Sequence, residues 1–280
     1  MLFRSIDIGV RLKMMDEARV DIHALSLTSP MVHWAPAELG VRLAQVFNDG
    51  CARVHAQHPT RFVGMATLPM QAPDLAVAEV KRAAQLPGIR GVYLPTHING
   101  KNLEEKEFWP VYEQCEKLSL PIFLHPVAPV GKERTGNYHL GNFLGNPYES
   151  GIAAASLIFG GVMDAFPKLD VMLPHAGGTF PWLIGRMDHG TTVRAECKHM
   201  TKPPSAYLKR FHYDTITHSD SILMYLIDHV GADRVVMGSD CPADMSYTRP
   251  VDVVERLKDL SAAQRDEIVG GNAAKLLKIA

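Results

Sequence analysis

The chain has 280 residues, of which 46% are hydrophobic and 21% are charged, and its formal net charge is −1. This is the composition of an ordinary globular protein, and the near-balance of charges gives no reason to expect a nucleic-acid or membrane partner. The sequence shows neither an apolar run of the ~20 residues that a membrane span requires nor a signal-peptide pattern. Its four cysteines are scattered. We therefore expect reduced thiols and a cytoplasmic protein.

Short β-rich runs recur along the chain, each followed by a loop and a helical stretch. Several of these runs are almost continuously apolar, which is typical of parallel strands that are covered on both faces. In chain order, the sequence predicts seven strands, with the sequences DIHALSL, RFVGMATL, IRGVYL, PIFLHP, DVMLPH, FHYDT and RVVMGSD.

Helix-like stretches separate these strands. The predicted helices are Pro36–Gln57, Pro73–Gln85, Glu107–Leu118, Glu149–Phe159, Phe180–Met187 and Ser219–Asp228, with two or three more between Val251 and Leu277. Strands that alternate with helices predict a single α/β domain over residues 1–280, either a (β/α) barrel or a doubly wound sheet. The sequence has no Gly-rich phosphate-binding turn, which disfavours a dinucleotide-binding sheet.

A (β/α)8 barrel needs eight strands, one more than the sequence shows. Each predicted strand already has a helix after it, whereas the helical run VRLKMMDEA near the start has no predicted strand before it. We therefore expect that the first strand of the barrel would precede Met1, and that the two edges of the remaining sheet lack partners.

Polar residues at the carboxyl ends of the predicted strands are the candidates for chemistry, because a barrel builds its active site there. His125 ends the run IFLH, His175 follows VMLP and Asp240 ends VVMGSD, while FHYDT adds His212 and Asp214. Any one of these histidines could merely hydrogen-bond a neighbouring loop. Together, two imidazoles and a carboxylate are a ligand set suited to Zn²⁺ or another divalent metal.

Four stretches resemble the amidohydrolase-2 family, namely FVGMATLPMQAPDLAVAEVKRA, FWPVYEQCEKLSLPIFLHP, GGVMDAFPKLDVMLPHAGGTFPWLIGRMDHG and VVMGSDCP. The resemblance covers almost the whole chain and implies a metal-dependent (β/α)8 TIM barrel. It implies that His125 and Asp240 bind the metal and that His175 is catalytic. Two further histidine ligands would stand on the first strand, ahead of Met1, and His23 would not be a ligand.

The same resemblance implies a place for the substrate. The arginine of the family's GR-x-x-HG stretch falls on Arg186, which would contact a substrate carboxylate through its planar, two-pronged guanidinium. Trp34 is a candidate for lining the pocket, although a tryptophan at this place is at least as often a packing residue.

The function implied is that of a metal-dependent decarboxylase acting on a small unsaturated or aromatic carboxylic acid. His175 would move a proton, and Asp240 would bind the metal and relay a proton. Two alternatives stay open, a hydrolase of a lactone or amide at the same site and a non-catalytic barrel, because fold and ligand types do not separate them. The expected partner is a small carboxylic acid, and a homodimer is left open.

Overall fold

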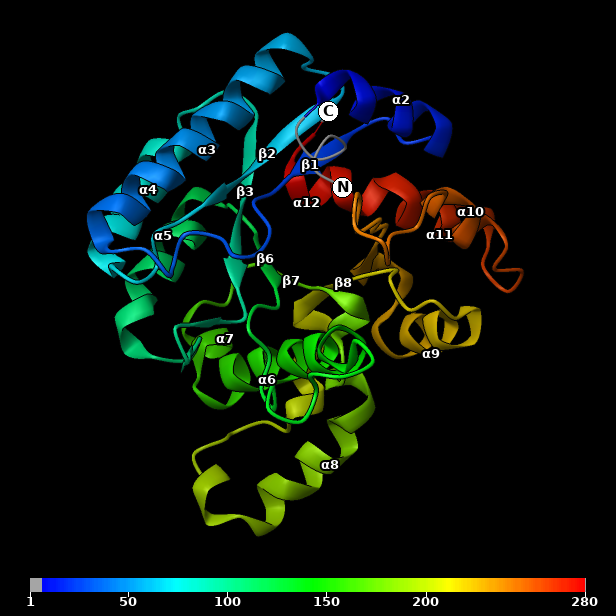
Figure 1. Cartoon of the computed structure of the whole chain (residues 1–280). Coiled ribbons are helices and arrows are strands. Elements are labelled where there is room, and N and C mark those ends of the chain that lie inside the picture. Colours follow the sequence, from blue (N-terminus) through cyan, green and yellow to red (C-terminus); the bar gives the residue numbers. More distant parts are fainter. Residues whose placement is uncertain (1–6, 280) are drawn as a thin grey trace.

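A parallel sheet of seven strands forms the centre of the computed structural model, which describes residues 7–279 (Figure 1). The strands lie in the sheet in chain order, β1-β2-β3-β6-β7-β8-β9, and all neighbours are parallel. The seven predicted strands are thereby confirmed, and a short hairpin of β4 and β5 is additional. The strands are β1 (His23–Leu25), β2 (Phe62–Thr67), β3 (Ile89–Pro95), β4 (His97–Ile98), β5 (Lys101–Asn102), β6 (Ile122–His125), β7 (Val171–Leu173), β8 (Phe211–Asp214) and β9 (Val235–Val236).

Helices connect successive strands and cover the outer face of the sheet (Figure 1). They are α2 (Ile8–Ala18), α3 (Ala37–Gln57), α4 (Pro73–Ala83), α5 (Trp109–Leu118), α6 (Asn146–Phe159), α7 (Val162–Ala165), α8 (Phe180–Val193), α9 (Asp220–Val230), α10 (Pro250–Glu255), α11 (Ala262–Asp266) and α12 (Asn272–Leu277). Helix α6 begins earlier than predicted because Pro147 stands in its first turn, where proline favours a helix start.

The two faces of each strand bury different side chains. Ile122 and Leu124 of β6 lie in the large hydrophobic core beneath the helices, whereas Phe123 between them packs inside the curled sheet. Because side chains alternate along a strand, His125 shares the inner face with Phe123. Apolar groups are thus required on both faces, which explains why the strand sequences are nearly continuous apolar runs.

The end of the chain packs inside the sheet. Leu277 of α12 lies in a buried cluster with Val63 and Met65 of β2, and Ile22 and Ile279 pack against the same cluster. Figure 1 shows the carboxyl terminus beside β1 and α12. The inner face is therefore a packed core and not an open channel.

The sheet curls without closing. Within residues 7–279, neither β1 nor β9 has a second neighbour, whereas a closed barrel joins its first strand to its last. The fold is a TIM barrel that lacks one strand in this part of the chain, as the sequence predicts. No helix in the described range is long and apolar enough to cross a membrane.

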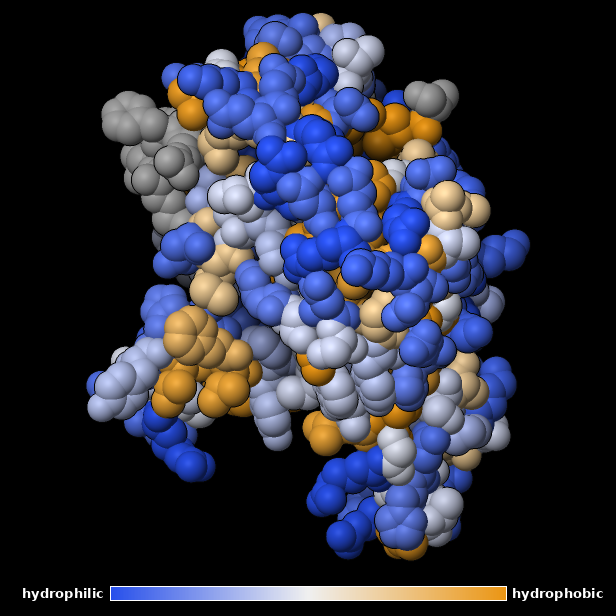
Figure 2. Space-filling view, turned by 90° about the vertical axis from the view of Figure 1, so that its right-hand side faces the viewer, coloured by the Kyte–Doolittle hydropathy of each residue, from blue (hydrophilic) through white to orange (hydrophobic). Residues whose placement is uncertain are grey.

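Helix α2 is attached to the rest of the molecule by charged side chains. Arg19, which follows α2, forms ion pairs with Asp252 and Glu255 of α10. The face that carries α2, α9 and α10 is largely hydrophilic, with apolar side chains in small patches only (Figure 2). Polar contacts therefore complement the apolar core on this side of the fold.

Candidate active site

The residues that the sequence singled out lie at one end of the sheet. His125 is the last residue of β6 and Asp214 is the last of β8, while His175 and Asp240 follow β7 and β9 after short loops. Because the strands are parallel, their carboxyl ends meet at one edge. We call this edge, with these four side chains, the mouth of the sheet.

Two histidines in the mouth lie near each other. The ring centroids of His125 and His175 are 6.2 Å apart with an interplanar angle of 60°. In both rings the Nδ1 atom is buried and forms no hydrogen bond within the described residues. Burial lowers the pKa of each imidazole to about 4, and the second histidine adds to this effect for His125. Both rings are therefore neutral at pH 7, the state in which imidazole accepts a proton or binds a metal.

Two carboxyl groups share the same place. The pKa of Asp240 is raised to about 6, first by burial and then by the nearby charge of Asp214. Asp214 is 4% exposed, and burial raises its pKa as well. Neither carboxyl forms an ion pair with lysine or arginine in the part of the chain that the structure describes. Because no lysine or arginine within residues 7–279 neutralises these two carboxyl groups, the mouth is favourable for a cation.

The loop after β7 has a left-handed backbone. His175, Ala176, Gly177 and Gly178 have φ angles of 54°, 55°, 79° and 58°. Glycine adopts this conformation freely, whereas a residue with a Cβ atom loses about 1–2 kcal/mol in it. A Cβ atom at Gly178 would also lie 2.0 Å from the carbonyl oxygen of Pro147. The two glycines of HAGG are therefore required by the turn, and His175 and Ala176 are strained residues within it.

The donor types at the mouth fit a divalent cation, because neutral imidazole and carboxylate are the ligands of many such sites. The unpaired Nδ1 atoms of His125 and His175 support this fit. No three His, Cys, Asp or Glu side chains of residues 7–279 are placed to hold one ion, and the sequence predicts two ligands, His125 and Asp240, for this chain. Zinc sites normally use three or four protein ligands. His125 and Asp240 remain predicted ligands of an incomplete set.

Arg186 and Trp34 are not brought into contact with these four side chains. Arg186 is exposed on α8 and forms no hydrogen bond or ion pair within the described range. Trp34 is 60% exposed in the loop after β1, and its indole N–H donates to the carbonyl of Met31 at 3.1 Å. Their roles in substrate binding stay predictions. His23 shares the outer face of β1 with Leu25, and the expectation that His23 is not a ligand stays a prediction.

Sequence reasoning missed two residues near the mouth. The Tyr93 ring of β3 lies 5.7 Å from the His125 ring, and the charges of Asp240 and Asp214 help to raise the pKa of its hydroxyl, after burial. His218 follows β8, and its positive charge would lower the pKa values of His175 and Asp240. A tyrosine inside a strand carries no local signal of function. A histidine four residues after a strand end does carry one, and it could have been found.

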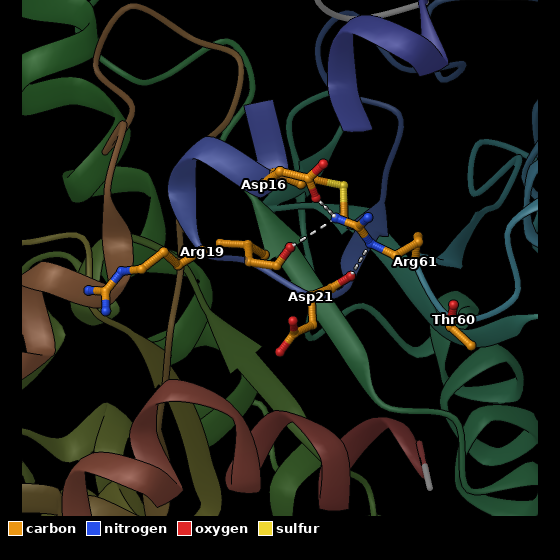
Figure 3. Close-up of a pocket in the computed structure, with 7 residues that line it drawn as sticks. Asp16, Arg19, Asp21, Thr60 and Arg61 are labelled. Atoms are coloured by element: carbon orange, nitrogen blue, oxygen red, sulfur yellow. Dashed lines mark hydrogen bonds and ion pairs between the residues drawn. The ribbon is translucent and has the colours of Figure 1, made fainter. Parts of the chain in front are cut away.

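A hollow with a volume of about 470 Å³ lies at the opposite, amino end of the sheet. Figure 3 shows Arg61 between Asp16 and Asp21, and Arg19 directed away from them. Arg61 donates to the Asp16 carboxylate at 2.7 Å and to the Asp21 carbonyl at 2.9 Å. Because Arg61 and Arg19 already have partners within the protein, we interpret the hollow as a structural contact between segments. We use the name base of the sheet for the residues around this hollow together with Asp252 and Glu255.

Comparison with known proteins agrees with this geometry. The amidohydrolase family model matches residues 3–279. The 2-amino-3-carboxymuconate-6-semialdehyde decarboxylase of Dictyostelium discoideum is 35% identical to this chain, over 98% of its length and 79% of the relative's. The chain is thus similar to a decarboxylase over almost its whole length.

Solved structures show the same relationship. The 5-carboxyvanillate decarboxylase of Sphingomonas paucimobilis superposes with a TM-score of 0.90 at 30% identity, covering 96% of this chain and 82% of that one. A dihydroxybenzoic acid decarboxylase of a Polaromonas species, crystallised with manganese and 2-nitroresorcinol, has a TM-score of 0.88 at 28% identity, covering 98% and 86%. These neighbours are decarboxylases, and one of them holds a divalent metal. The chain itself is a member of the amidohydrolase family.

Proposed function

We propose that this protein is a metal-dependent, non-oxidative decarboxylase of a small unsaturated or aromatic carboxylic acid. The observation that carries the proposal is the pair of neutral imidazoles of His125 and His175, whose buried Nδ1 atoms have no hydrogen-bond partner within the described residues, beside two carboxyl groups at the carboxyl end of the sheet. The similarity to decarboxylases across nearly the whole chain supports it.

The reaction replaces a carboxylate on carbon by a hydrogen and consumes one proton, and in the order that we propose this proton reaches the carbon before carbon dioxide leaves. His175 is the residue that we assign to this proton. Burial keeps its imidazole neutral near pH 7, so the ring can accept a proton from solvent or from a substrate hydroxyl and pass it to the carbon.

His125 and Asp240 are the residues that would hold the metal. Zinc is the ion that we propose, since imidazole and carboxylate are its usual ligands, and manganese is the alternative because a structural neighbour binds it. When bound, a divalent cation would draw electron density from the substrate and favour loss of the carboxylate. Asp240 would also relay a proton, while Tyr93 packs beside His125 and limits where its ring can lie.

The proposed substrate is a small carboxylic acid of the kind named for the relatives. A Rhizobium neighbour was crystallised with 2,6-dihydroxybenzoate. Arg186 would grip a carboxylate and Trp34 would line the approach, which requires that both reach the substrate from α8 and from the loop after β1. The cytoplasmic location and the homodimer stay predictions.

A second candidate is a barrel without catalytic activity. The observation in its favour is that the described residues bring no three metal-binding side chains together. Hydrolysis of a lactone or amide at the same site is the remaining alternative, and no feature of the geometry favours it.

Product analysis separates the three possibilities. The purified chain would be incubated with Zn²⁺ or Mn²⁺ and with carboxyl-¹³C-labelled 2,6-dihydroxybenzoate, 5-carboxyvanillate or 2-amino-3-carboxymuconate 6-semialdehyde. We expect labelled carbon dioxide from at least one acid, and none from the His175→Ala variant. A cleaved lactone or amide without carbon dioxide would establish the hydrolase instead. No turnover by a folded, metal-loaded chain would leave the non-catalytic barrel.

A further inference from the structure

The buried carboxylate of Asp214 accepts hydrogen bonds from the turn that carries His175. Its Oδ2 atom accepts the backbone N–H of His175 at 2.9 Å, and its Oδ1 atom accepts the N–H of Ala176 at 2.8 Å. Oδ1 also accepts the N–H of Ile216 at 3.0 Å. Three backbone donors therefore converge on one side chain that is 4% exposed.

These hydrogen bonds stabilise a left-handed backbone conformation that is unfavourable without them. His175 and Ala176 both have positive φ angles, which side chains with a Cβ atom disfavour. Their successive N–H groups point the same way and form an anion-binding nest, which the Asp214 carboxylate fills. A left-handed backbone at His175 decides the direction in which its side chain leaves the chain. The imidazole consequently lies 6.2 Å from the His125 ring.

The other contacts of the turn do not duplicate this role. The N–H of Gly178 donates to the carbonyl of His175 at 2.8 Å, and the N–H of Gly177 donates to that of Pro174 at 3.0 Å. These bonds close the turn on itself. Among the backbone hydrogen bonds of the His175–Ala176 segment within residues 7–279, those to Asp214 tie it to the sheet, because Asp214 ends strand β8.

We propose that Asp214 is a positioning residue for catalysis, which fixes the orientation of the His175 imidazole by binding the two N–H groups of the left-handed turn. The inference rests on the proposed function in so far as His175 moves the proton. Asp214 is not assigned contact with substrate or metal, and its effect passes through His175.

The near-isosteric variant Asp214→Asn tests this role. An amide offers one oxygen and one NH2 group, so either orientation turns an N–H donor toward a backbone N–H. We expect kcat to fall by roughly 10–100-fold, the scale of a slightly misplaced catalytic group, with KM changed by less than about twofold. Metal content and circular dichroism should match the wild type. Glu79→Gln is the control for loss of a buried carboxylate, because Glu79 is 2% exposed and binds Asn48 and Arg82 instead of the turn that carries His175.

A double-mutant cycle separates positioning from a general structural role. If Asp214 acts through His175, Asp214→Asn should cost less than about twofold in a His175→Ala background. A full additional loss there would show that Asp214 acts through Asp240 or through the fold, and would overturn the proposal. Unchanged kcat in the single variant would overturn it equally.

One readout does not depend on activity or on the variant folding. In the wild-type protein, the amide protons of His175 and Ala176 should resonate downfield and exchange slowly, as expected for N–H groups bound to a buried carboxylate. Fast exchange of both would refute the inference. A wild type that releases no carbon dioxide would refute the proposed function, and the exchange measurement would still decide whether Asp214 holds the turn.

Discussion

The mouth and the base of the same sheet treat ionisable groups in opposite ways. At the base, Arg61 and Arg19 each face carboxylates, and the pairs are partly open to solvent. At the mouth, His125 and His175 have buried nitrogen atoms without partners, and Asp240 has no arginine or lysine beside it within the described residues. The base therefore pairs its charged groups within the protein. The mouth leaves two imidazole nitrogen atoms and the Asp240 carboxyl group without such partners in the described range.

This difference in pairing, and not the volume of a hollow, is the reason why we expect the chemistry at the mouth. The hollow at the base is about 470 Å³, yet its cations are already bound to the protein. Exposed ion pairs contribute little to stability. Buried polar groups without partners lower the stability of the fold, so a protein that keeps them usually needs them for its function. The expectation is therefore large functional effects from changes at the mouth and small effects from changes at the base.

The largest effect should come from the two histidines of the mouth. His175→Ala should lower turnover by roughly 10²–10⁴-fold, the range for lost acid–base catalysis, with metal content nearly unchanged. His125→Ala should lose metal and activity together. Steady-state kinetics and metal analysis after dialysis measure both. Loss of metal in His175→Ala alone would mean that the two histidines have exchanged roles.

Acidification should destabilise the fold through its buried histidines. The pKa values of His23, His33, His125 and His175 are each lowered to about 4, chiefly by burial. Between pH 6.5 and 4 the unfolded chain binds protons that the folded chain does not, so stability is lost as the pH falls. Each such residue contributes up to about 3 kcal/mol over this range.

Urea unfolding at several pH values measures this loss. His33→Asn should reduce the slope of unfolding free energy against pH by about one proton, since His33 is 6% exposed and is not one of the four side chains of the mouth. His139→Asn serves as the control for loss of an exposed histidine. Equal slopes in wild type and His33→Asn would show that His33 is not buried in the neutral form.

A smaller effect on the kinetics is expected from a change on α8. Its size tests whether the substrate site extends from the mouth to that helix. Arg186→Lys keeps the charge but loses the two-pronged grip, so KM should rise by roughly tenfold with a smaller change in kcat. Arg194→Lys, also exposed near the end of α8, is the matched control. Unchanged kinetics in Arg186→Lys would place that residue outside the substrate site.

The smallest effect should come from the base. Arg19→Ala removes the ion pairs with Asp252 and Glu255, which are open to solvent and screened by salt. The thermal midpoint should fall by about 2 °C or less, and kcat should not change. A large loss of turnover would show that the base is coupled to the mouth and would break the contrast between them.

The strands and the strand-end residues could be predicted from sequence because their signals are local. Apolar runs such as IFLH require burial on both faces, and a parallel sheet then places the residues that end them at one edge. His125, His175, Asp214 and Asp240 follow from that rule. The family was also evident, since its motifs extend along the whole chain.

The rest depends on contacts between distant segments. Asp214 binds the His175 turn across 39 residues of chain, and no local pattern encodes such a bond. Tyr93 resembles any strand tyrosine until its ring lies against His125. The exposed position of Arg186 likewise appears only when the helix that carries it is placed in space.

The sequential order of strands in the sheet has a consequence for how the protein is made. Each new strand pairs only with the one before it, so during synthesis the sheet can extend by one crossover at a time from β1 toward β9. Ribosomes deliver the chain at ~5–20 residues per second, which leaves seconds between successive strands. Two contacts can form only after the carboxyl-terminal helices have been synthesised. Arg19 then pairs with α10, and Leu277 packs against β2 and Ile22. Until then the nascent sheet has an uncovered inner face, and this is the interval in which a chaperone would be needed.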